Sequence, residues 1–353
     1  MKHNDILAAM ISPLCSWYET NKRQLPWRKN RDPYRVWVSE IMLQQTRVEA
    51  ALPYYQRFLE ALPTVEALAN APVDLLLKLW EGLGYYSRVR NMQKAAQTVV
   101  EVYGGQFPAD RKLLSGLSGI GEYTAGAVAS IAFNLPEPAV DGNVLRVIAR
   151  LLDDDTDIML PAFKKQIQGA LAAVYPQAKD CGDLTQAIME LGALVCIPGG
   201  VPKCDKCPLA HLCQAKQNGR EQVLPVRNVK KEKKLEKRTV FVLEHEGKLA
   251  LIKRPESGVL AGMWEFPAVE GHVALKAVNK AVESMGGAER VSKLASHRHV
   301  FTHLVWDMKG YYVLAKEKSE AFFWITPEEL AHTVALPSAI KPFFQAYLEQ
   351  KKG

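Results

Sequence analysis

Four cysteines gather in one short run of a chain that has six cysteines in all. Their spacing is Cys196-x7-Cys204-x2-Cys207-x5-Cys213. Three kinds of site fit such a run: a tetrahedral zinc ion, an iron–sulfur cluster or two disulfides. Disulfides fit least, because the N-terminal stretch lacks the basic n-region and the A-x-A cleavage site of a secreted protein. Zinc sites more often use two tight C-x2-C pairs, and only one pair is tight here, so we favour an iron–sulfur cluster.

A second candidate site is the segment LSGIGEYTA, residues 117–125. Gly119 and Gly121 flank one aliphatic residue, which permits a turn whose backbone N–H groups face outward. At a helix N-terminus such groups bind a phosphate without any side chain. A lone G-x-G more often marks a plain turn, but the apolar residue before it and the Thr-Ala after it match the helix–hairpin–helix motif. We therefore expect Gly119 and Gly121 to contact the backbone of DNA.

Two carboxylates could carry acid–base chemistry. Glu40 lies in the helical pattern VWVSEIML, which is apolar nearly all round, so we expect its side chain to be buried or to line a pocket. Burial raises the pKa of a carboxyl group and lets it act as a general acid near neutral pH. Asp141 precedes a predicted helix and could be a simple N-cap, although the helix dipole also favours its ionised form. One protonated and one ionised carboxyl is the pair that cleaves a glycosidic bond.

The elements that position these residues are helical in the first part of the chain. The 353 residues are enough for about two domains that each bury a core. Asp32-Pro33 is a helix start signal. Helices are predicted over residues 34–48, 73–80, 88–103, 122–133, 143–152, 163–175 and 184–195. No apolar run approaches the roughly 18 residues that a membrane span needs, so no membrane association is expected.

The net charge of +7 hints at nucleic acid, but its distribution weakens the hint. Nine Lys or Arg against three Glu lie between Lys216 and Arg238. We interpret residues 216–237 as a basic linker. It is either a solvated tether or a segment whose charge attracts phosphate. After this segment the hydrophobic period becomes two, which predicts an α+β domain.

Within that domain, one hairpin is predicted around Glu246-Gly247 and a second around Lys309-Gly310. A helix is predicted over residues 275–285, and another follows the start signal at Thr326.

Together these motifs resemble the MutY family of adenine DNA glycosylases, in the helix–hairpin–helix glycosylase superfamily. The matching stretches are LPWR (25–28), VWVSEIMLQQTRV (36–48), WEGLGYYSRVRN (80–91), LSGIGEYTAGA (117–127), AVDGNVLRV (139–147), ELGALVC (190–196) and CDKCPLAHLC (204–213). They follow the order of the family over most of residues 20–215. The resemblance favours an iron–sulfur centre, a 4Fe-4S cluster, over zinc, although the first cysteine spacing is longer than the family's usual one.

The resemblance implies a multidomain protein. An all-α helix–hairpin–helix glycosylase domain covers residues 1–215, with a six-helix barrel at about 30–135 and an iron–sulfur subdomain from 1–29 and 136–215. A Nudix-like domain of the α+β class covers residues 238–353, with GMWEFP (262–267) as its anchor. A Nudix hydrolase needs several carboxylates on the following helix to hold magnesium. Because Glu283 is the only one there, we expect no pyrophosphatase chemistry.

Site residues follow from the resemblance position by position. Glu40 corresponds to the glutamate that protonates adenine, and Asp141 to the aspartate that stabilises the sugar cation. Asn143 and Tyr123 would orient the sugar side of the site. Tyr123 also stands where lyase-type relatives carry a lysine nucleophile, so no Schiff base can form there and a monofunctional enzyme is implied.

Other matched residues concern DNA and the two bases. Gln45 and Tyr85 match residues that wedge into the duplex when adenine is flipped out. The residues near the adenine pocket are Trp27, Arg28 and Gln186. In the family, a Phe-Ser-His loop of the C-terminal domain reads the 8-oxoguanine opposite adenine. It is matched here by Phe301, Thr302 and His303.

The prediction is thus a monofunctional DNA glycosylase of base excision repair. It would hydrolyse the N-glycosidic bond of adenine mispaired with 8-oxoguanine or guanine in double-stranded DNA, as an intracellular monomer associated with DNA. Two alternatives remain: another mismatch glycosylase of the superfamily, acting on thymine opposite guanine, and a non-catalytic iron–sulfur DNA-binding protein. The C-terminal domain argues against the first, because simple relatives lack it.

Overall fold

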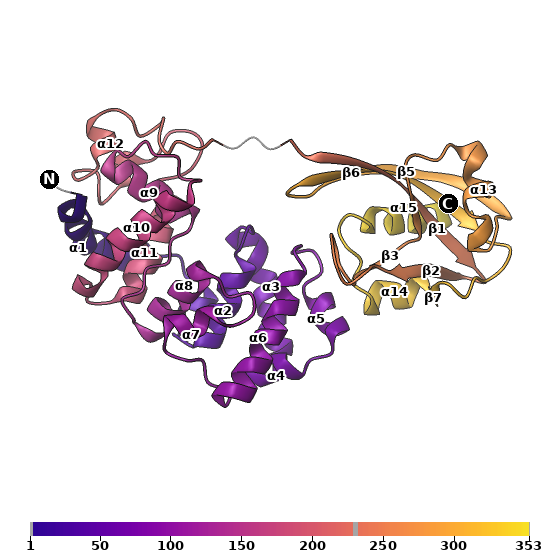
Figure 1. Ribbon diagram of the computed structural model, residues 1–353, viewed down its shortest axis with the longest axis horizontal. Coiled ribbons are helices and arrows are strands. Elements are labelled where there is room, and N and C mark those ends of the chain that lie inside the picture. The colour runs from indigo at the N-terminus through magenta and orange to yellow at the C-terminus, as the bar shows by residue number, and fades with distance from the viewer. Residues whose placement is uncertain (1–2, 229–231, 353) are drawn as a thin grey trace. The chain divides into compact units, whose positions relative to one another are not determined.

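The computed structural model describes residues 3–228 and 232–352. They form two compact units, one drawn from residues 1–70 and 91–229 and the other from residues 71–90 and 230–353 (Figure 1). None of the described helices is long and apolar enough to cross a membrane.

The first unit contains helices and no strand among its described residues. The α-helices are α1 (His3–Asn21), α2 (Pro33–Met42), α3 (Val48–Ala61), α4 (Val65–Asn70), α7 (Arg111–Ser115), α8 (Glu122–Phe133), α9 (Gly142–Leu152), α10 (Pro161–Val174), α11 (Cys181–Leu194) and α12 (Gln214–Gln217), with most of α6 (Ser87–Tyr103). Short 3-10 turns are η1 (Pro26–Arg28), η2 (Tyr175–Gln177) and η3 (Cys204–Lys206). The helices predicted over 88–103, 122–133, 143–152, 163–175 and 184–195 are confirmed, with small shifts at their ends.

Helix α2 starts as predicted but ends earlier. The Asp32 side chain caps it by accepting the Arg35 N–H at 2.9 Å, and Pro33 occupies its first turn. The expected continuation to Val48 is wrong, because the chain turns after Met42 and passes through Gln45 in a left-handed conformation, at a φ of 60°. The break separates α2 from α3.

Helix α1, which the patterns above did not predict, joins a core made with α9, α10 and α11. The buried side chains of this core include Leu7, Met10, Leu14, Val147, Ile148, Phe163, Leu171, Leu184 and Ile188. Cys196, Cys207 and Cys213 pack against the same core. The cysteine run therefore rests on a rigid apolar base.

Part of the expected linker also packs on the first unit. Arg150 Nε donates to the Leu224 carbonyl at 2.8 Å, and the Ile158 N–H donates to the Val226 carbonyl at 3.1 Å. At the other end of the expected linker, β1 already begins at Lys234. The described part of residues 216–237 therefore includes residues packed on the first unit and the start of β1.

The second unit is built on a mixed sheet of order β3-β2-β1-β6-β5, in which β1 and β6 are parallel. The strands are β1 (Lys234–His245), β2 (Lys248–Lys253), β3 (Trp264–Glu265), β4 (Ala268–Glu270), β5 (Arg290–Val300), β6 (Leu304–Leu314) and β7 (Phe323–Ile325). Helices α14 (Pro327–Thr333) and α15 (Lys341–Lys352) pack on the sheet face that carries Val240 and Met308. The start signal at Thr326 is confirmed by a capping box with Glu329.

Residues 71–90, with α5 (Val73–Leu79), belong to this second unit. Lys78 Nζ donates to the carbonyls of Ala331 and Val334 at 2.8 and 3.2 Å, and Lys341 pairs with Glu81 at 3.2 Å. Polar contacts therefore tie this segment to the C-terminal part of the chain.

The first predicted hairpin is confirmed and the second is wrong. Glu246 and Gly247, both at positive φ, form the two-residue turn between β1 and β2. Lys309 and Gly310 instead lie inside β6, and the turn between β5 and β6 is Phe301–His303. Gly310 is a packing requirement, because a Cβ there would lie 2.6 Å from the ring of Phe343.

The helix expected over residues 275–285 is also broken into short pieces. These are η4 (Leu275–Ala277), α13 (Val278–Ala281) and η5 (Glu283–Met285). Gly286 and Gly287 follow at positive φ and end the segment.

Candidate active site

A cavity of about 850 Å³ lies in the first unit. Its lining comes from η1, α2 and the turn that follows it, the starts of α3 and α9, and from α8, α10 and α11. The predicted site residues on this lining are Trp27, Arg28, Glu40, Gln45, Gly121, Tyr123, Asp141, Asn143 and Gln186. Residues scattered from position 27 to position 186 thus meet around one space large enough for a base.

Glu40 is the buried carboxyl of this cavity, with 7% of its surface exposed. This confirms the expectation from the apolar pattern of α2. Tyr123 Oη donates a hydrogen bond to Glu40 Oε2 at 2.7 Å. Burial raises the pKa of Glu40 to about 7; the charge of Asp141 also raises it, whereas the Tyr123 hydrogen bond and the charge of Arg28 oppose the rise.

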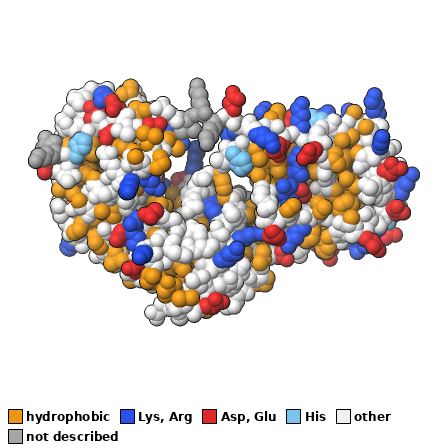
Figure 2. Space-filling view, viewed as in Figure 1, with side chains coloured by type: hydrophobic (Ala, Val, Ile, Leu, Met, Phe, Trp, Pro, Cys, Tyr) orange, Lys and Arg blue, Asp and Glu red, His pale blue; other side chains and the backbone are white. Residues whose placement is uncertain are grey.

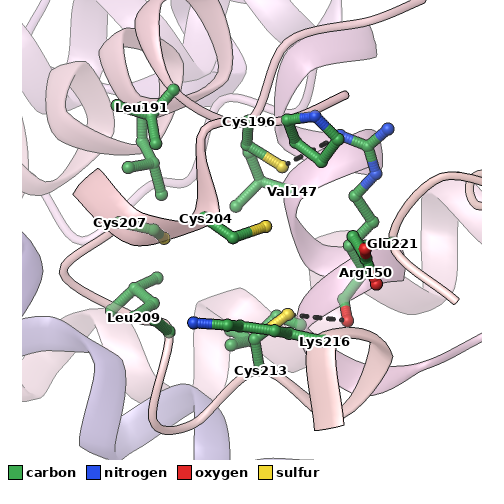
Figure 3. Close-up of a pocket in the computed structure, with 14 residues that line it drawn as sticks. Val147, Arg150, Leu191, Cys196, Cys204, Cys207, Leu209, Cys213, Lys216 and Glu221 are labelled. Carbon is green, nitrogen blue, oxygen red and sulfur yellow. Dashed lines mark hydrogen bonds between the residues drawn. The ribbon is translucent and has the colours of Figure 1, made fainter. Parts of the chain in front are cut away.

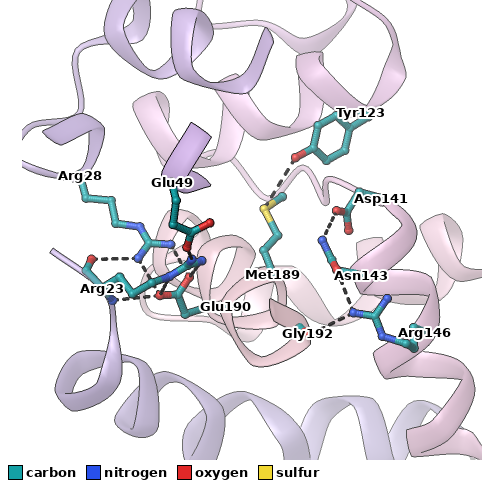
Figure 4. Close-up of polar contacts among 10 residues, drawn as sticks. All are labelled: Arg23, Arg28, Glu49, Tyr123, Asp141, Asn143, Arg146, Met189, Glu190 and Gly192. Carbon is teal, nitrogen blue, oxygen red and sulfur yellow. Dashed lines mark hydrogen bonds and ion pairs between the residues drawn. The ribbon is translucent and has the colours of Figure 1, made fainter. Parts of the chain in front are cut away.

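Asp141 is the N-cap of α9 and faces the same cavity. Its Oδ1 accepts the Val144 N–H at 2.8 Å, and its Oδ2 accepts the Asn143 side-chain amide at 2.7 Å. Asn143 Oδ1 in turn accepts from Arg146 at 2.8 Å, as Figure 4 shows. The Asp141 side chain can therefore cap α9 and face the cavity at the same time. The hydrogen bonds fix the orientation of Asp141 and Asn143.

Sequence reasoning missed Glu190 and its partner Arg23 on the cavity wall. The Glu190 side chain is 1% exposed and binds both Arg23 and Arg28 (Figure 4). Burial alone would raise the pKa of Glu190, but the hydrogen bonds from the two arginines lower it to about 2. The signal was available, because Glu190 lies in the apolar pattern of α11 just as Glu40 lies in that of α2.

Gln45 and Tyr85 share an uncommon backbone conformation. Their φ angles are 60° and 48°, in the left-handed region that side chains other than glycine rarely adopt. Each such residue costs on the order of 1–3 kcal/mol, and such strain concentrates at functional sites. Gln45 lies on the cavity lining, and Tyr85 is 46% exposed. Asn134, Asp153, Glu246 and Leu260 also have positive φ angles, so the wedge roles of Gln45 and Tyr85 stay predictions.

The glycine turn precedes α8. Gly119 has a φ of 75°, and a Cβ there would lie 2.7 Å from the Asn91 side chain, so this position requires glycine. Gly121 is the N-cap of α8 and has open space around it. The turn has the form expected for the hairpin motif, while phosphate binding by it stays a prediction.

The four cysteines of the run line one small cavity, of about 30 Å³, with Val147, Leu191 and Leu209 (Figure 3). All six cysteines are free in the structure. Arg150 Nη1 donates to Cys196 Sγ at 3.3 Å, which places a positive charge beside the thiols. Among the described residues, no group of three or more His, Cys, Asp or Glu is arranged to hold a single metal ion. Four convergent thiols, an apolar lining and a guanidinium donor form a set that fits an anionic iron–sulfur cluster.

In the second unit, Phe301, Thr302 and His303 form the β5–β6 turn. Phe301 packs against Trp306, with ring centroids 4.9 Å apart. The Thr302 hydroxyl forms a hydrogen bond of 2.6 Å with Tyr85 Oη. The structure thus brings two predicted DNA-contacting residues, Tyr85 and Thr302, together within this unit.

Charge is mixed on the face of the molecule shown in Figure 2. Lys and Arg side chains lie over both units, with Asp and Glu side chains among them. The excess positive charge is therefore not gathered in one block on this face.

Comparison with known proteins agrees with this geometry. Residues 38–172 match the family model described as "HhH-GPD superfamily base excision DNA repair protein", and residues 239–346 match the NUDIX domain. The human adenine DNA glycosylase is 34% identical, over 98% of this chain and 75% of its own length. That of Buchnera aphidicola subsp. Acyrthosiphon pisum is 30% identical, over 94% of this chain and 95% of its own length.

A solved structure of a thermostable thymine-DNA glycosylase covers 61% of this chain and 98% of its own, with 28% identity and a TM-score of 0.55. The helical fold is therefore shared with a glycosylase that is named for another base. The human and Buchnera adenine DNA glycosylases match along nearly the whole chain, through both the helical and the Nudix-like parts. The chain belongs to the adenine DNA glycosylase family.

Proposed function

We propose that this protein is a monofunctional adenine DNA glycosylase, which hydrolyses the N-glycosidic bond of adenine opposite 8-oxoguanine or guanine. The observation that supports it most is the pair of carboxyl groups on one cavity: Glu40, buried with a pKa raised to about 7, and Asp141, held by a helix N-terminus. Glycosidic cleavage needs one carboxyl group that donates a proton and one carboxylate that stabilises positive charge. The two side chains lie in correspondingly different environments.

Glu40 protonates a ring nitrogen of adenine in this scheme. With a pKa of about 7, it retains its proton in roughly half of the molecules at neutral pH. Protonation makes adenine a better leaving group, and the proton moves from the Glu40 carboxyl to the base. Asp141 then stabilises the positive charge that develops on the sugar, and Asn143 fixes its carboxylate at 2.7 Å.

Monofunctional hydrolysis rests on the residue at position 123. A tyrosine there offers no amine for a Schiff base. Lys164 also lines the cavity, so it is the lysine to test as an alternative nucleophile. Borohydride should trap no covalent adduct with DNA, and strand cleavage should need added alkali. Trapping that disappears in Lys164→Ala would contradict a monofunctional reaction.

We assign recognition of the base opposite adenine to the second unit. Phe301 is half-buried and Thr302 is exposed in the β5–β6 turn, and Tyr85 is held beside Thr302. We assign 8-oxoguanine reading to this turn and the wedge to Tyr85, with Gln45 as the wedge on the side of the cavity.

Cys196, Cys204, Cys207 and Cys213 are the residues that would hold a 4Fe-4S cluster. Such a cluster, bound by all four cysteines, would link the two ends of the loop formed by residues 196–213. Lys203 and Lys206, within this loop, would then be presented to the phosphates of DNA. The protein would act on DNA inside the cell as a monomer.

The experiment that tests this function compares substrates. Single-turnover base release is measured on duplexes containing adenine opposite 8-oxoguanine, adenine opposite guanine and thymine opposite guanine. Adenine release from the first two with no thymine release is expected. Thymine release as the main activity would favour the other mismatch glycosylase, and no release from any duplex would favour a non-catalytic protein.

A further inference from the structure

One buried carboxylate binds two arginines on the wall of the active-site cavity. Glu190 Oε1 accepts the backbone N–H and the Nε of Arg23, both at 2.9 Å, and Oε2 accepts Arg23 Nη2 at 2.9 Å. Arg28 adds contacts of 3.1 Å to Oε1 and 2.8 Å to Oε2 (Figure 4). Both oxygens of Glu190 are therefore fully used, and neither is free to contact a substrate.

The two arginines have other contacts that define their positions. Arg28 Nη1 also donates to the Arg23 carbonyl at 3.0 Å. The buried Nε of Arg28 has no hydrogen-bond partner. The nearest other carboxylate of Arg23 is Glu49 at 3.8 Å, whose side chain is 79% exposed and contributes little. The cluster thus carries more positive than negative charge.

Both arginines line the cavity that contains Glu40. A buried N–H donor without a partner is unfavourable until an acceptor reaches it. The ring nitrogens of adenine are acceptors of the kind that a flipped base would bring into the cavity.

We propose that Glu190 is a positioning residue for the glycosylase reaction, which holds Arg23 and Arg28 in one fixed fork against the base. The inference rests on the proposed function, in which adenine enters this cavity and is protonated by Glu40. Glu190 acts through the arginines and does not itself touch the base.

The charge of Glu190 should also influence the pKa of Glu40, which a residue with a merely structural role would not do. The groups that act on Glu40 are Tyr123 from α8, Asp141 from the start of α9 and Arg28 from η1. Loss of the Glu190 charge leaves the guanidiniums uncompensated, which favours the Glu40 carboxylate and lowers its pKa. Because the reaction needs the protonated form, the decline of the rate with rising pH should move to lower pH.

The test measures single-turnover adenine release from an A·guanine duplex over a range of pH, together with duplex affinity. Glu190→Gln should lower the rate by about 10- to 100-fold and move the midpoint of the pH profile down, with duplex affinity within about threefold of wild type. Glu190→Asp keeps the charge but cannot reach both guanidiniums. It should keep the wild-type midpoint and lose less of the rate.

A matched control lies in the second unit. Glu265 is also a buried carboxylate shared by two arginines, Arg238 at 3.3 Å and Arg254 at 2.7 Å. Glu265→Gln should lower the unfolding temperature but leave the rate and pH midpoint of adenine release unchanged. A similar loss in both variants would assign the effect to general stability and overturn the proposal.

Two further outcomes decide the proposal. A wild-type rate and midpoint in Glu190→Gln would overturn it; if that variant does not fold, a wild-type rate in Glu190→Asp would do so. Glu40→Gln separates this from the proposed function. Adenine release retained in Glu40→Gln removes the acid role of Glu40, and no adenine release by the wild-type protein removes the proposed function. An inactive Glu40→Gln beside a fully active Glu190→Gln removes only the present inference.

Discussion

Tyr123 donates a hydrogen bond of 2.7 Å to Glu40 inside the active-site cavity. Glu40 comes from α2 and Tyr123 from the first turn of α8, so the packing of these two helices defines the position of the acid. Glu40 is buried and Tyr123 is half-buried. Burial also raises the pKa of Tyr123 well above its usual value. The tyrosine therefore stays a neutral hydrogen-bond donor while the carboxyl group gains or loses its proton.

Adenine release should decline as the pH rises through about 7. The reason is that the folded protein holds Glu40 with a raised pKa and uses its protonated form. Single-turnover rates on one duplex, measured across neutral pH, check this. Tyr123→Phe removes a hydrogen bond that lowers this pKa, so the midpoint of that variant should move upward. A rate independent of pH in both proteins would contradict the assignment of the acid.

Glu40→Gln should stabilise the protein at alkaline pH. A carboxyl group whose pKa rises from 4.5 to about 7 on folding contributes stability that is present below pH 4.5 and lost as pH passes through about 7. The amide has no such loss, so the free energy of unfolding of the variant should exceed that of wild type by roughly 3 kcal/mol above pH 7. Denaturant unfolding at acidic and alkaline pH measures the difference, which should vanish at acidic pH. A constant difference would contradict the buried ionisation.

The purified protein should be yellow-brown and contain about four irons per chain, as a 4Fe-4S cluster implies. Cys204→Ser should lose iron and visible absorbance, because its thiol lines the cavity of the cysteine run. Cys181→Ser is the matched control, since Cys181 is buried in α11 away from that cavity. Loss of the cluster should weaken DNA binding more than global folding. Stoichiometric zinc with no visible absorbance would contradict the proposal.

Phe301→Ala with Thr302→Ala should reduce the preference for 8-oxoguanine over guanine opposite adenine. A lost reading contact is worth about 1–3 kcal/mol per base, which is roughly 5- to 150-fold in the ratio of rates. Val300→Ala, an exposed neighbour on β5, is the control and should keep the preference. If the double variant also kept it, recognition of the damaged base would have to lie in the first unit.

Removal of residues 238–353 should likewise shrink that preference while adenine release from A·guanine duplexes stays measurable. All of the proposed catalytic residues precede residue 150. The truncation also removes the carbonyl partners of Lys78, so the segment that carries Tyr85 loses part of its support. The wedge role of Tyr85 is therefore better tested by the point variant Tyr85→Ser.

Burial and capping could be predicted from the sequence where the signal is local. Glu40 was expected to be buried because its helix is apolar on all sides, and Asp141 was expected at a helix start because the pattern begins just after it. Glu190 carries the same signal as Glu40. Its importance was missed because its partners Arg23 and Arg28 lie far away in sequence and only the fold brings them together.

The errors in secondary structure have a similar cause. The pattern around Lys309-Gly310 predicts a turn, but the ring of Phe343 from α15 leaves no room for a side chain at Gly310. The helical pattern of residues 34–48 includes Gln45, but the helix ends before it and Gln45 has a strained φ angle of 60°. A tertiary contact overrides local preference at Gly310, and the turn at Gln45 coincides with a proposed DNA-contacting residue.

The central claim is that Glu40 is the acid that releases adenine, and Glu40→Gln tests it most directly. Base release from a duplex with adenine opposite 8-oxoguanine is measured under single-turnover conditions, with duplex affinity measured in parallel. The amide fills the same space but cannot donate the proton, so the rate should fall by about 100- to 10,000-fold while affinity is retained. Adenine release at the wild-type rate by a folded, DNA-binding Glu40→Gln protein would contradict the account.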